Sequence, residues 1–108
     1  MTEQASFGVL LTMRVKPGCA QRFEEAIRRV AATVADHPGN VGQAVFLDIE
    51  DELTYVISSE WVSEHAFREH ERSPEHRRAI AALRDLRADS AMAVMHLVHR
   101  LTPEPGPR

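Results

Sequence analysis

The stretch from Tyr55 to Leu86 constrains the fold of this chain more than any other part of the sequence. A β-rich segment ends at Trp61, and two short helical segments follow it. Ser63 suits the N-cap of the first helix, and Ser73 followed by Pro74 is a stronger start signal for the second. Trp61, the only tryptophan, therefore stands where a strand gives way to a helix. Its ring can form a pocket wall while its N–H reaches a polar partner, or it can be a core side chain closing that corner.

A longer amphipathic helix is predicted for residues 19–37, between the turn residues Lys16-Pro17-Gly18 and Pro38-Gly39. Its apolar side chains recur at helical spacing and form one stripe, which consists of Phe23, Ala26, Ile27, Val30, Ala31 and Val34. The β-rich segments predict four strands, over residues 7–15, 43–49, 53–61 and 92–101. The predicted order is therefore β-α-β-β-α-α-β.

This order indicates a ferredoxin-like α+β fold, in which a four-stranded antiparallel sheet carries its helices on one face. Such a sheet should alternate between apolar and polar residues, but the first, second and fourth strands are apolar on both faces. A single chain would leave Leu10, Phe46 and Val98 exposed together. We therefore expect a homodimer in which the second face of the sheet packs on the sheet of a partner.

Length and composition favour one small domain, residues 1–101, followed by a proline-rich disordered tail, residues 102–108. The net charge of −3 and the pI near 6.0 provide no field that would attract a phosphate backbone, so we expect no nucleic-acid partner. The sequence contains neither a signal-peptide pattern nor a long apolar run, which predicts a cytoplasmic protein without a membrane partner. Cys19 is the only cysteine, so no internal disulfide can form.

The six histidines do not have the spacing of a metal site. His65, His70 and His76 lie five and six residues apart, which does not put two imidazoles on one helix face. We interpret His76 as a surface residue near a helix start and His70 as a candidate polar group in a pocket. Neither a nucleophile motif nor a glycine-rich loop for phosphate, flavin or nicotinamide is found, so we expect neither metal nor organic cofactor.

Several short motifs together resemble the antibiotic biosynthesis monooxygenase family, which belongs to the dimeric α+β barrel superfamily. They are Val15-Lys16-x-Gly18-x4-Phe23, His37-Pro38-Gly39 with Gly42, and Tyr55-Val56-Ile57-x2-Glu60-Trp61-x-Ser63-Glu64-x-Ala66-Phe67-x2-His70-x2-Ser73-Pro74-x-His76. The resemblance implies a dimer with a pocket in each protomer between the sheet and its own helices. It also implies oxygenation without metal or flavin, in which a deprotonated phenol or anthrone passes an electron to O2 and ends as a quinone.

Two branches of this family differ in their pocket residues. Where the haem-degrading branch has an asparagine, a tryptophan and a histidine, this chain has Leu11, His70 and Ile80, so the resemblance does not extend to haem degradation. The quinone-forming branch shares Trp61 but has an asparagine and a tyrosine at the positions of Ile57 and Phe67. These positions are therefore apolar walls here.

Together these features predict a cofactor-independent monooxygenase that oxidises a phenolic or anthrone-like polycyclic aromatic to a quinone with O2. The predicted catalytic residues are Trp61, His70 and Tyr55. The predicted substrate-binding residues are Leu11, Ile57, Ser59, Phe67 and Ile80. Two alternatives stay open: a polyketide cyclase or isomerase on the same scaffold, and a non-catalytic dimeric protein that binds an aromatic ligand.

Overall fold

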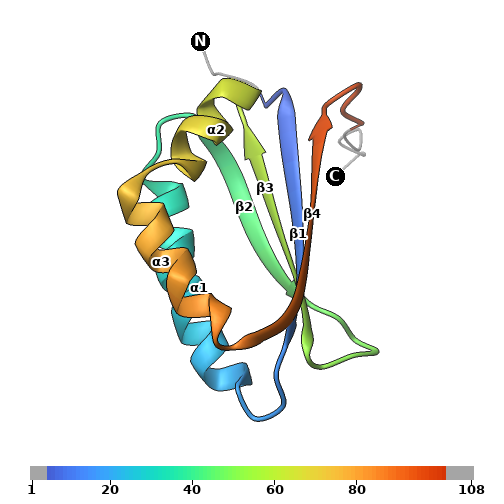
Figure 1. The fold of residues 1–108 in the computed structure, drawn as a ribbon. Helices are drawn as coiled ribbons and strands as arrows, with labels where there is room; N and C mark the ends of the chain where they lie inside the picture. The colour runs from blue at the N-terminus through green and yellow to red at the C-terminus, as the bar shows by residue number, and fades with distance from the viewer. Residues whose placement is uncertain (1–4, 102–108) are drawn as a thin grey trace, which may run out of the picture.

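The computed structural model describes residues 5–101, and it consists of a four-stranded antiparallel sheet with three helices on one face (Figure 1). The elements are β1 (Phe7–Val15), α1 (Ala20–Ala35), β2 (Asn40–Leu47), β3 (Thr54–Trp61), α2 (Glu64–Glu71), α3 (Pro74–Arg84) and β4 (Arg87–His96). The predicted order of elements and the ferredoxin-like α+β class are confirmed. The predicted tail, residues 102–108, lies outside the described residues.

The strands lie in the order β2-β3-β1-β4, so β1 is central and pairs with both β3 and β4. In this register Leu11 lies opposite Ile57 on one side and opposite Met92 on the other. Alternate residues point to opposite faces of a strand, so these three side chains share the face that the helices cover. This shared face later forms one wall of a cavity.

Two glycines shape the turns on either side of α1. Gly18 has a φ of 82°, a backbone conformation that favours glycine, and it turns the chain from β1 into α1. A Cβ atom on Gly39 would lie 2.5 Å from the Cβ of Ala66, so only glycine lets the end of α1 approach α2 this closely. Between them, the predicted apolar stripe is buried at Phe23, Ala26, Ile27, Val30 and Val34.

The two short helices begin where their capping residues predict. The Ser63 hydroxyl accepts a hydrogen bond from the backbone N–H of Ala66 at 3.1 Å, and the Ser73 hydroxyl accepts one from that of His76 at 3.2 Å. Each cap satisfies an N–H that would otherwise have no partner in the helix. Because α2 ends at Glu71 and α3 begins at Pro74, His70 and His76 lie on either side of a tight corner.

The fourth strand was predicted too late in the chain. It spans Arg87–His96 rather than residues 92–101, because Val15 pairs with Arg87 and Phe7 pairs with His96. One more backbone bond follows the ladder, from the N–H of Leu97 to the oxygen of Ser6 at 2.9 Å. The strand therefore ends there although Leu97 and Val98 are apolar. The sequence did not reveal residues 87–91 of this strand, because they are largely exposed and show no alternation of apolar and polar residues.

The second strand was also predicted slightly late, and a local turn explains where it ends. It spans Asn40–Leu47 rather than residues 43–49. The Asp48 carboxylate accepts hydrogen bonds from the N–H groups of Glu50 and Asp51, at 2.7 and 3.3 Å. These bonds form the turn two residues earlier than the apolar pattern suggests.

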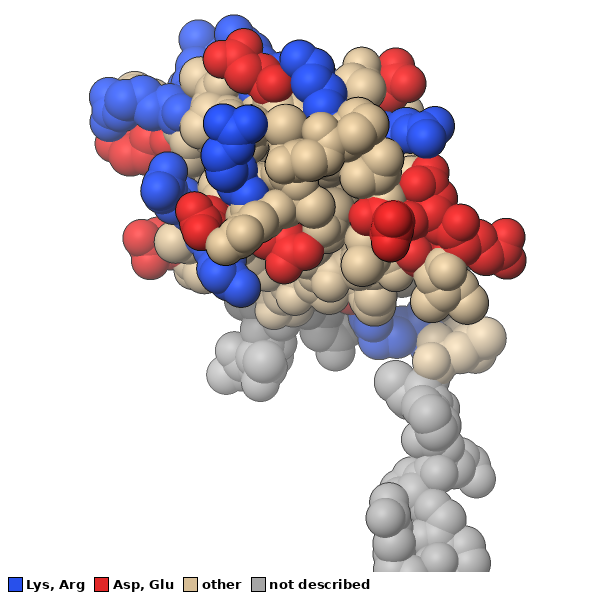
Figure 2. Space-filling view, turned by 90° about the horizontal axis from the view of Figure 1, so that it is seen from below, with Lys and Arg blue, Asp and Glu red and all other residues tan. Residues whose placement is uncertain are grey.

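The face of the sheet opposite the helices carries exposed apolar side chains. Leu10 on β1 is 38% exposed and Phe46 on β2 is 57% exposed. Val98 is also exposed, but it lies beyond the end of β4 rather than on the sheet. Acidic and basic side chains are interspersed on the end of the molecule shown in Figure 2. Within residues 5–101, none of the helices is long and apolar enough to cross a bilayer.

Candidate functional site

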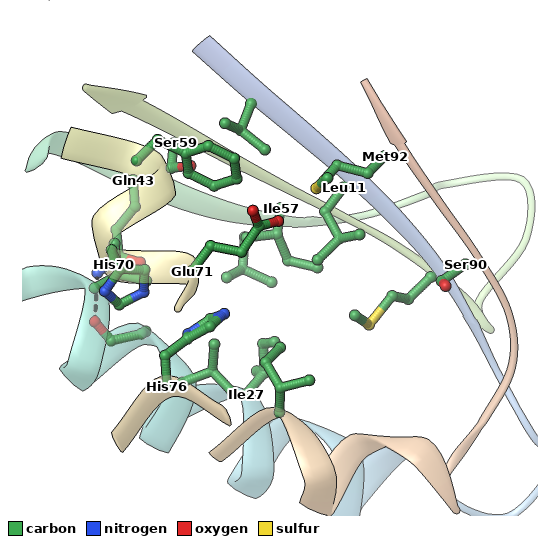
Figure 3. Close-up of a pocket in the computed structure, with 18 of the residues that line it drawn as sticks. Leu11, Ile27, Gln43, Ile57, Ser59, His70, Glu71, His76, Ser90 and Met92 are labelled. Carbon is green, nitrogen blue, oxygen red and sulfur yellow. Dashed lines mark hydrogen bonds between the residues drawn. The ribbon is translucent and has the colours of Figure 1, made fainter. Parts of the chain in front are cut away.

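A cavity of about 380 Å³ lies between the sheet and the helices. Residues of both clusters of buried side chains line it, such as Ile27 of one cluster and Trp61 of the other. In Figure 3 Leu11 and Ile57 lie on the sheet side, Ile27 lies on the helix side, and Ser90 and Met92 lie at the end away from His70. The lining is mainly apolar; His70, Glu71 and His76 lie at the α2–α3 end, and other polar side chains border the cavity elsewhere.

Most of the predicted site residues meet at this cavity. The lining includes Leu11, Ile57, Ser59, Trp61, Phe67, His70 and Ile80. They come from β1, β3, α2 and α3, which are brought together only by the packing of the helices on the sheet. The predicted catalytic and substrate-binding groups thus share one space, with the exception of Tyr55.

Tyr55 faces the helices but lies under α1, away from the cavity. Its ring packs on Phe23 with 4.7 Å between centroids, and its hydroxyl donates a hydrogen bond to the Glu24 carboxylate at 2.5 Å. Burial, together with that carboxylate, raises the pKa of Tyr55 to about 12. Strand alternation correctly placed Tyr55 on the face of the sheet that the helices cover. Its hydroxyl is bound to Glu24 because α1 lies directly over it.

Trp61 is a wall of the cavity and also part of the core, since it is only 1% exposed. Its indole N–H donates a hydrogen bond to the Ser59 hydroxyl oxygen at 2.9 Å. Its ring meets Phe67 edge-on at 5.6 Å and His70 at 5.2 Å. The Trp61 N–H, which the sequence suggested as a donor to a polar partner, is thus bound within the protein. The Ser59 hydroxyl still has its own proton, which it can donate to a ligand in the cavity.

His70 is almost completely buried although its side chain is polar, with an exposure of 3%. Its Nε2 atom is buried and has no hydrogen-bond partner. Burial, together with the neighbouring rings of His76 and His37, lowers the pKa of His70 to about 4. At neutral pH this imidazole is therefore uncharged and carries a lone pair.

His76 is not the surface residue that its position at a helix start suggested. Its ring lies 4.2 Å from that of His70, it lines the cavity, and its Nδ1 atom is also buried without a partner. Burial lowers the pKa of His76, while the Glu71 carboxylate opposes that shift. The signal that could have revealed it is the Ser73-Pro74 cap, because a tight corner after His70 brings the first turn of α3 back toward α2.

Other polar lining residues were not foreseen from the sequence. Gln43 on β2 donates its side-chain N–H to the backbone oxygen of Ala31 at 2.7 Å, and Glu71 lies over the cavity beside His76 (Figure 3). Three arginines also border the cavity, namely Arg77, Arg84 and Arg87. Across residues 5–101, no group of three or more histidine, cysteine, aspartate or glutamate side chains is arranged to hold a metal ion.

The sequence matches a known protein family over most of its length. The family model for antibiotic biosynthesis monooxygenases matches residues 6–82, which is more than half of the chain. The chain belongs to the antibiotic biosynthesis monooxygenase family. The match covers every element from β1 to most of α3, and so includes Trp61, His70 and His76.

Solved structures agree with this assignment to the antibiotic biosynthesis monooxygenase family. SnoaB, described as a cofactor-independent oxygenase from Streptomyces nogalater, is 25% identical with a TM-score of 0.83, and the match covers 94% of this chain and 100% of that one. A Caulobacter crescentus protein, assigned provisionally to the same family, is 25% identical with a TM-score of 0.82, over 90% and 93% of the two chains. A conserved Methanosarcina mazei protein has the same fold at 17% identity and a TM-score of 0.80, over 86% and 93% of the two chains. No curated protein matches the sequence.

Proposed function

We propose that this chain is a cofactor-independent monooxygenase that oxidises a phenolic or anthrone-like polycyclic aromatic to a quinone with O2. Membership of the family supports a monooxygenase in general terms. The likeness to SnoaB, which is described as cofactor-independent, supports the narrower class. The observation that carries the proposal is an apolar cavity with an uncharged, buried imidazole at one end.

The cavity suits a flat aromatic substrate in both size and polarity. Its volume of about 380 Å³ lies at the small end of the range for ligand pockets, which is about 300–1,000 Å³. Leu11, Ile57 and Ile80 provide apolar surface for fused rings, and Phe67 provides an aromatic edge. Most of the exposed lining is apolar, so a ligand with many hydroxyl groups would lose more hydrogen bonds to water than it could regain here.

For an anthrone the reaction is balanced by O2 alone. The ring CH2 group and one O2 become a ring C=O group and one water molecule, so carbon loses four electrons and O2 gains them. The first step is removal of a proton, which gives an electron-rich anion able to reduce O2. His70 is the proposed base because its imidazole is neutral and lines the cavity. The Ser59 hydroxyl is a proposed donor to the developing oxyanion.

Tyr55 has no role in this proposal, because its hydroxyl already donates to Glu24 outside the cavity. Trp61 acts as a wall and holds Ser59 in place through its N–H. A homodimer is part of the proposal, because Leu10 and Phe46 lie exposed on the face of the sheet that no helix covers. Burying that face against a second copy would remove apolar surface from water.

The test is oxygen uptake by the purified protein, after treatment with a chelator, on addition of 1,8-dihydroxyanthrone. We expect one O2 consumed for each quinone formed, well above the rate without protein. Ile80→Trp fills the cavity and should abolish turnover, whereas Ala82→Trp, on an exposed part of α3, should leave it unchanged. Conversion without oxygen uptake would instead favour a cyclase or isomerase, and tight binding without any conversion would favour a non-catalytic protein.

A further inference from the structure

Two arginines, Arg84 and Arg87, border the cavity at the end away from His70. Arg84 lies in the last turn of α3, and Arg87 is the first residue of β4. His76, which lies beside His70, is at the other end of α3. At a rise of about 1.5 Å per residue, Arg84 lies about 12 Å along the helix from His76. The cavity therefore has imidazoles at one end and guanidinium groups at the other.

The spacing of residues along α3 places Arg84 on the face that lines the cavity. Arg77, Ile80 and Arg84 are three and four residues apart, which puts them on one face of a helix, and all three line the cavity. Arg78 lies on the same helix but is exposed and outside the lining. A cation is favourable at a helix C-terminus, which explains Arg84 but not Arg87 on the following strand.

An irregularity in β4 brings Arg87 onto the same face as Ser90. In a regular strand, residues three positions apart point to opposite faces. Val15 nevertheless pairs with Arg87, and Met13 pairs with Ser90. The register shifts next to Val15, so β4 has one more residue than β1 in this stretch, as in a β-bulge. Because Met13 and Val15 share one face of β1, their two partners share that face as well, and both partners line the cavity.

The positive charge at this end of the cavity has no acidic counterpart in the lining. Among the described residues, Glu71 is the only acidic one that lines the cavity, and it lies toward the opposite end (Figure 3). Asp85 and Asp89 follow the two arginines in the chain, but neither lines the cavity. Within residues 5–101, neither Arg84 nor Arg87 forms an ion pair. Two like charges beside an apolar cavity favour a ligand that brings a negative charge.

We propose that Arg84 and Arg87 bind a carboxylate, so that the substrate is an aromatic acid with its carboxylate at this end of the cavity and its phenol at His70. The carboxylate site can be tested by itself, whereas the orientation toward His70 rests on the proposed function. A guanidinium group presents its N–H donors in a planar fork that matches the two oxygens of a carboxylate. The Ser90 hydroxyl lines the same end and can donate a further hydrogen bond.

The length of the cavity agrees with a ligand of this kind. A fused three-ring aromatic with a carboxylate on an outer ring is comparable in length to the stretch of α3 between His76 and Arg84, about 12 Å. Holding the carboxylate at one end fixes which ring faces His70, and such positioning speeds a reaction by keeping the reacting groups together. An uncharged anthrone lacks this anchor and can enter in either direction.

The test is calorimetric titration of the full chain with two anthraquinones that differ in one substituent. They are 4,5-dihydroxyanthraquinone-2-carboxylate and 1,8-dihydroxy-3-methylanthraquinone, and both are already quinones, so binding is measured without turnover. We expect the carboxylate to bind about tenfold or more tightly at low salt, because it gains charged hydrogen bonds. Since Arg84 is exposed, this advantage should shrink as the salt concentration rises.

Glutamine variants show which arginines provide the advantage. Arg84→Gln and Arg87→Gln should each reduce it by about threefold or more, and the double variant should abolish it. Arg78→Gln is the matched control, because it removes the same charge from α3 outside the cavity and should leave the advantage unchanged. Equal affinity of the wild type for the two anthraquinones would overturn the proposal, as would an equal loss in Arg78→Gln. Should the variants fail to fold, the comparison in the wild type still decides.

Oxygen uptake with the two corresponding anthrones separates the carboxylate site from the proposed function. We expect kcat/KM to be about tenfold or more higher for the acid, and this ratio to fall in Arg84→Gln. Preferential binding of the carboxylate without any oxygen uptake would refute the proposed function and retain the site. Oxygen uptake without any preference for the carboxylate would refute the site and retain the proposed function.

Discussion

Replacing Trp61 by phenylalanine separates the packing role of this side chain from its hydrogen bond to Ser59. The substitution removes one buried N–H···O bond of 2.9 Å, and such a bond contributes about 0.5–1.5 kcal/mol. It also removes about 40 Å³ of side chain at a residue that is 1% exposed, which at about 24 cal/mol per Å³ of cavity adds about 1 kcal/mol. We therefore expect Trp61→Phe to lower the free energy of unfolding by about 2 kcal/mol.

The assay is urea unfolding followed by circular dichroism, on Trp61→Phe, Ser59→Ala and the double variant. Ser59→Ala leaves a buried N–H without an acceptor, so it should cost about 1–3 kcal/mol in the wild type. In the Trp61→Phe background that N–H is gone, so the same change should cost much less. The hydrogen bond therefore predicts a coupling free energy of about 1 kcal/mol between the two positions.

Equal effects of Ser59→Ala in both backgrounds would refute this reasoning. Activity gives a second measurement, because the Ser59 hydroxyl is the proposed donor to substrate whereas the Trp61 N–H is already engaged. Ser59→Ala should therefore lower kcat more than Trp61→Phe does, once both variants are shown to be folded. A larger loss in Trp61→Phe would mean that the indole N–H turns to the substrate during the reaction.

Four further predictions rest on burial, charge and sequence. Phe46→Asp should convert a dimer into a less stable monomer. The dimer itself is checked by sedimentation equilibrium of the wild type at micromolar concentration, and a mass of 12.1 kDa, that of one chain, would contradict it. Hemin should not bind specifically, because Ile80 replaces the axial histidine of the haem-degrading branch; a saturable Soret shift at one haem per chain would refute this. The lowered pKa of His70 means that the unfolded chain binds a proton near pH 6.5 and the folded one only near pH 4, so stability should be full above pH 6.5 and fall toward pH 4. His70→Gln should flatten urea midpoints over that window, and an unchanged slope would exclude His70 as the cause. The raised pKa of Tyr55 has the opposite sense: its stabilisation is present below pH 10 and is lost as the pH rises toward 12, which absorbance at 295 nm with unfolding curves would check.

Local signals in the sequence determined the elements and their order. The stripe that includes Phe23 and Val30 fixed α1, and the caps Ser63 and Ser73 fixed the starts of α2 and α3. These signals are reliable because the interactions behind them join residues only a few positions apart. The predicted face of Trp61 also held, since alternation along a strand is a local property.

Features that depend on distant neighbours were decided only by the tertiary structure. The ends of β4 follow from where β1 begins and ends, since a strand needs a partner for its backbone groups. Tyr55 lies on the predicted face, yet α1 covers it and Glu24 binds its hydroxyl. His76 was taken for a surface residue because spacing along the chain does not show that the corner after α2 turns its ring against His70. Burial, and with it the charge state of each histidine, is a property of the packed layers and not of any segment.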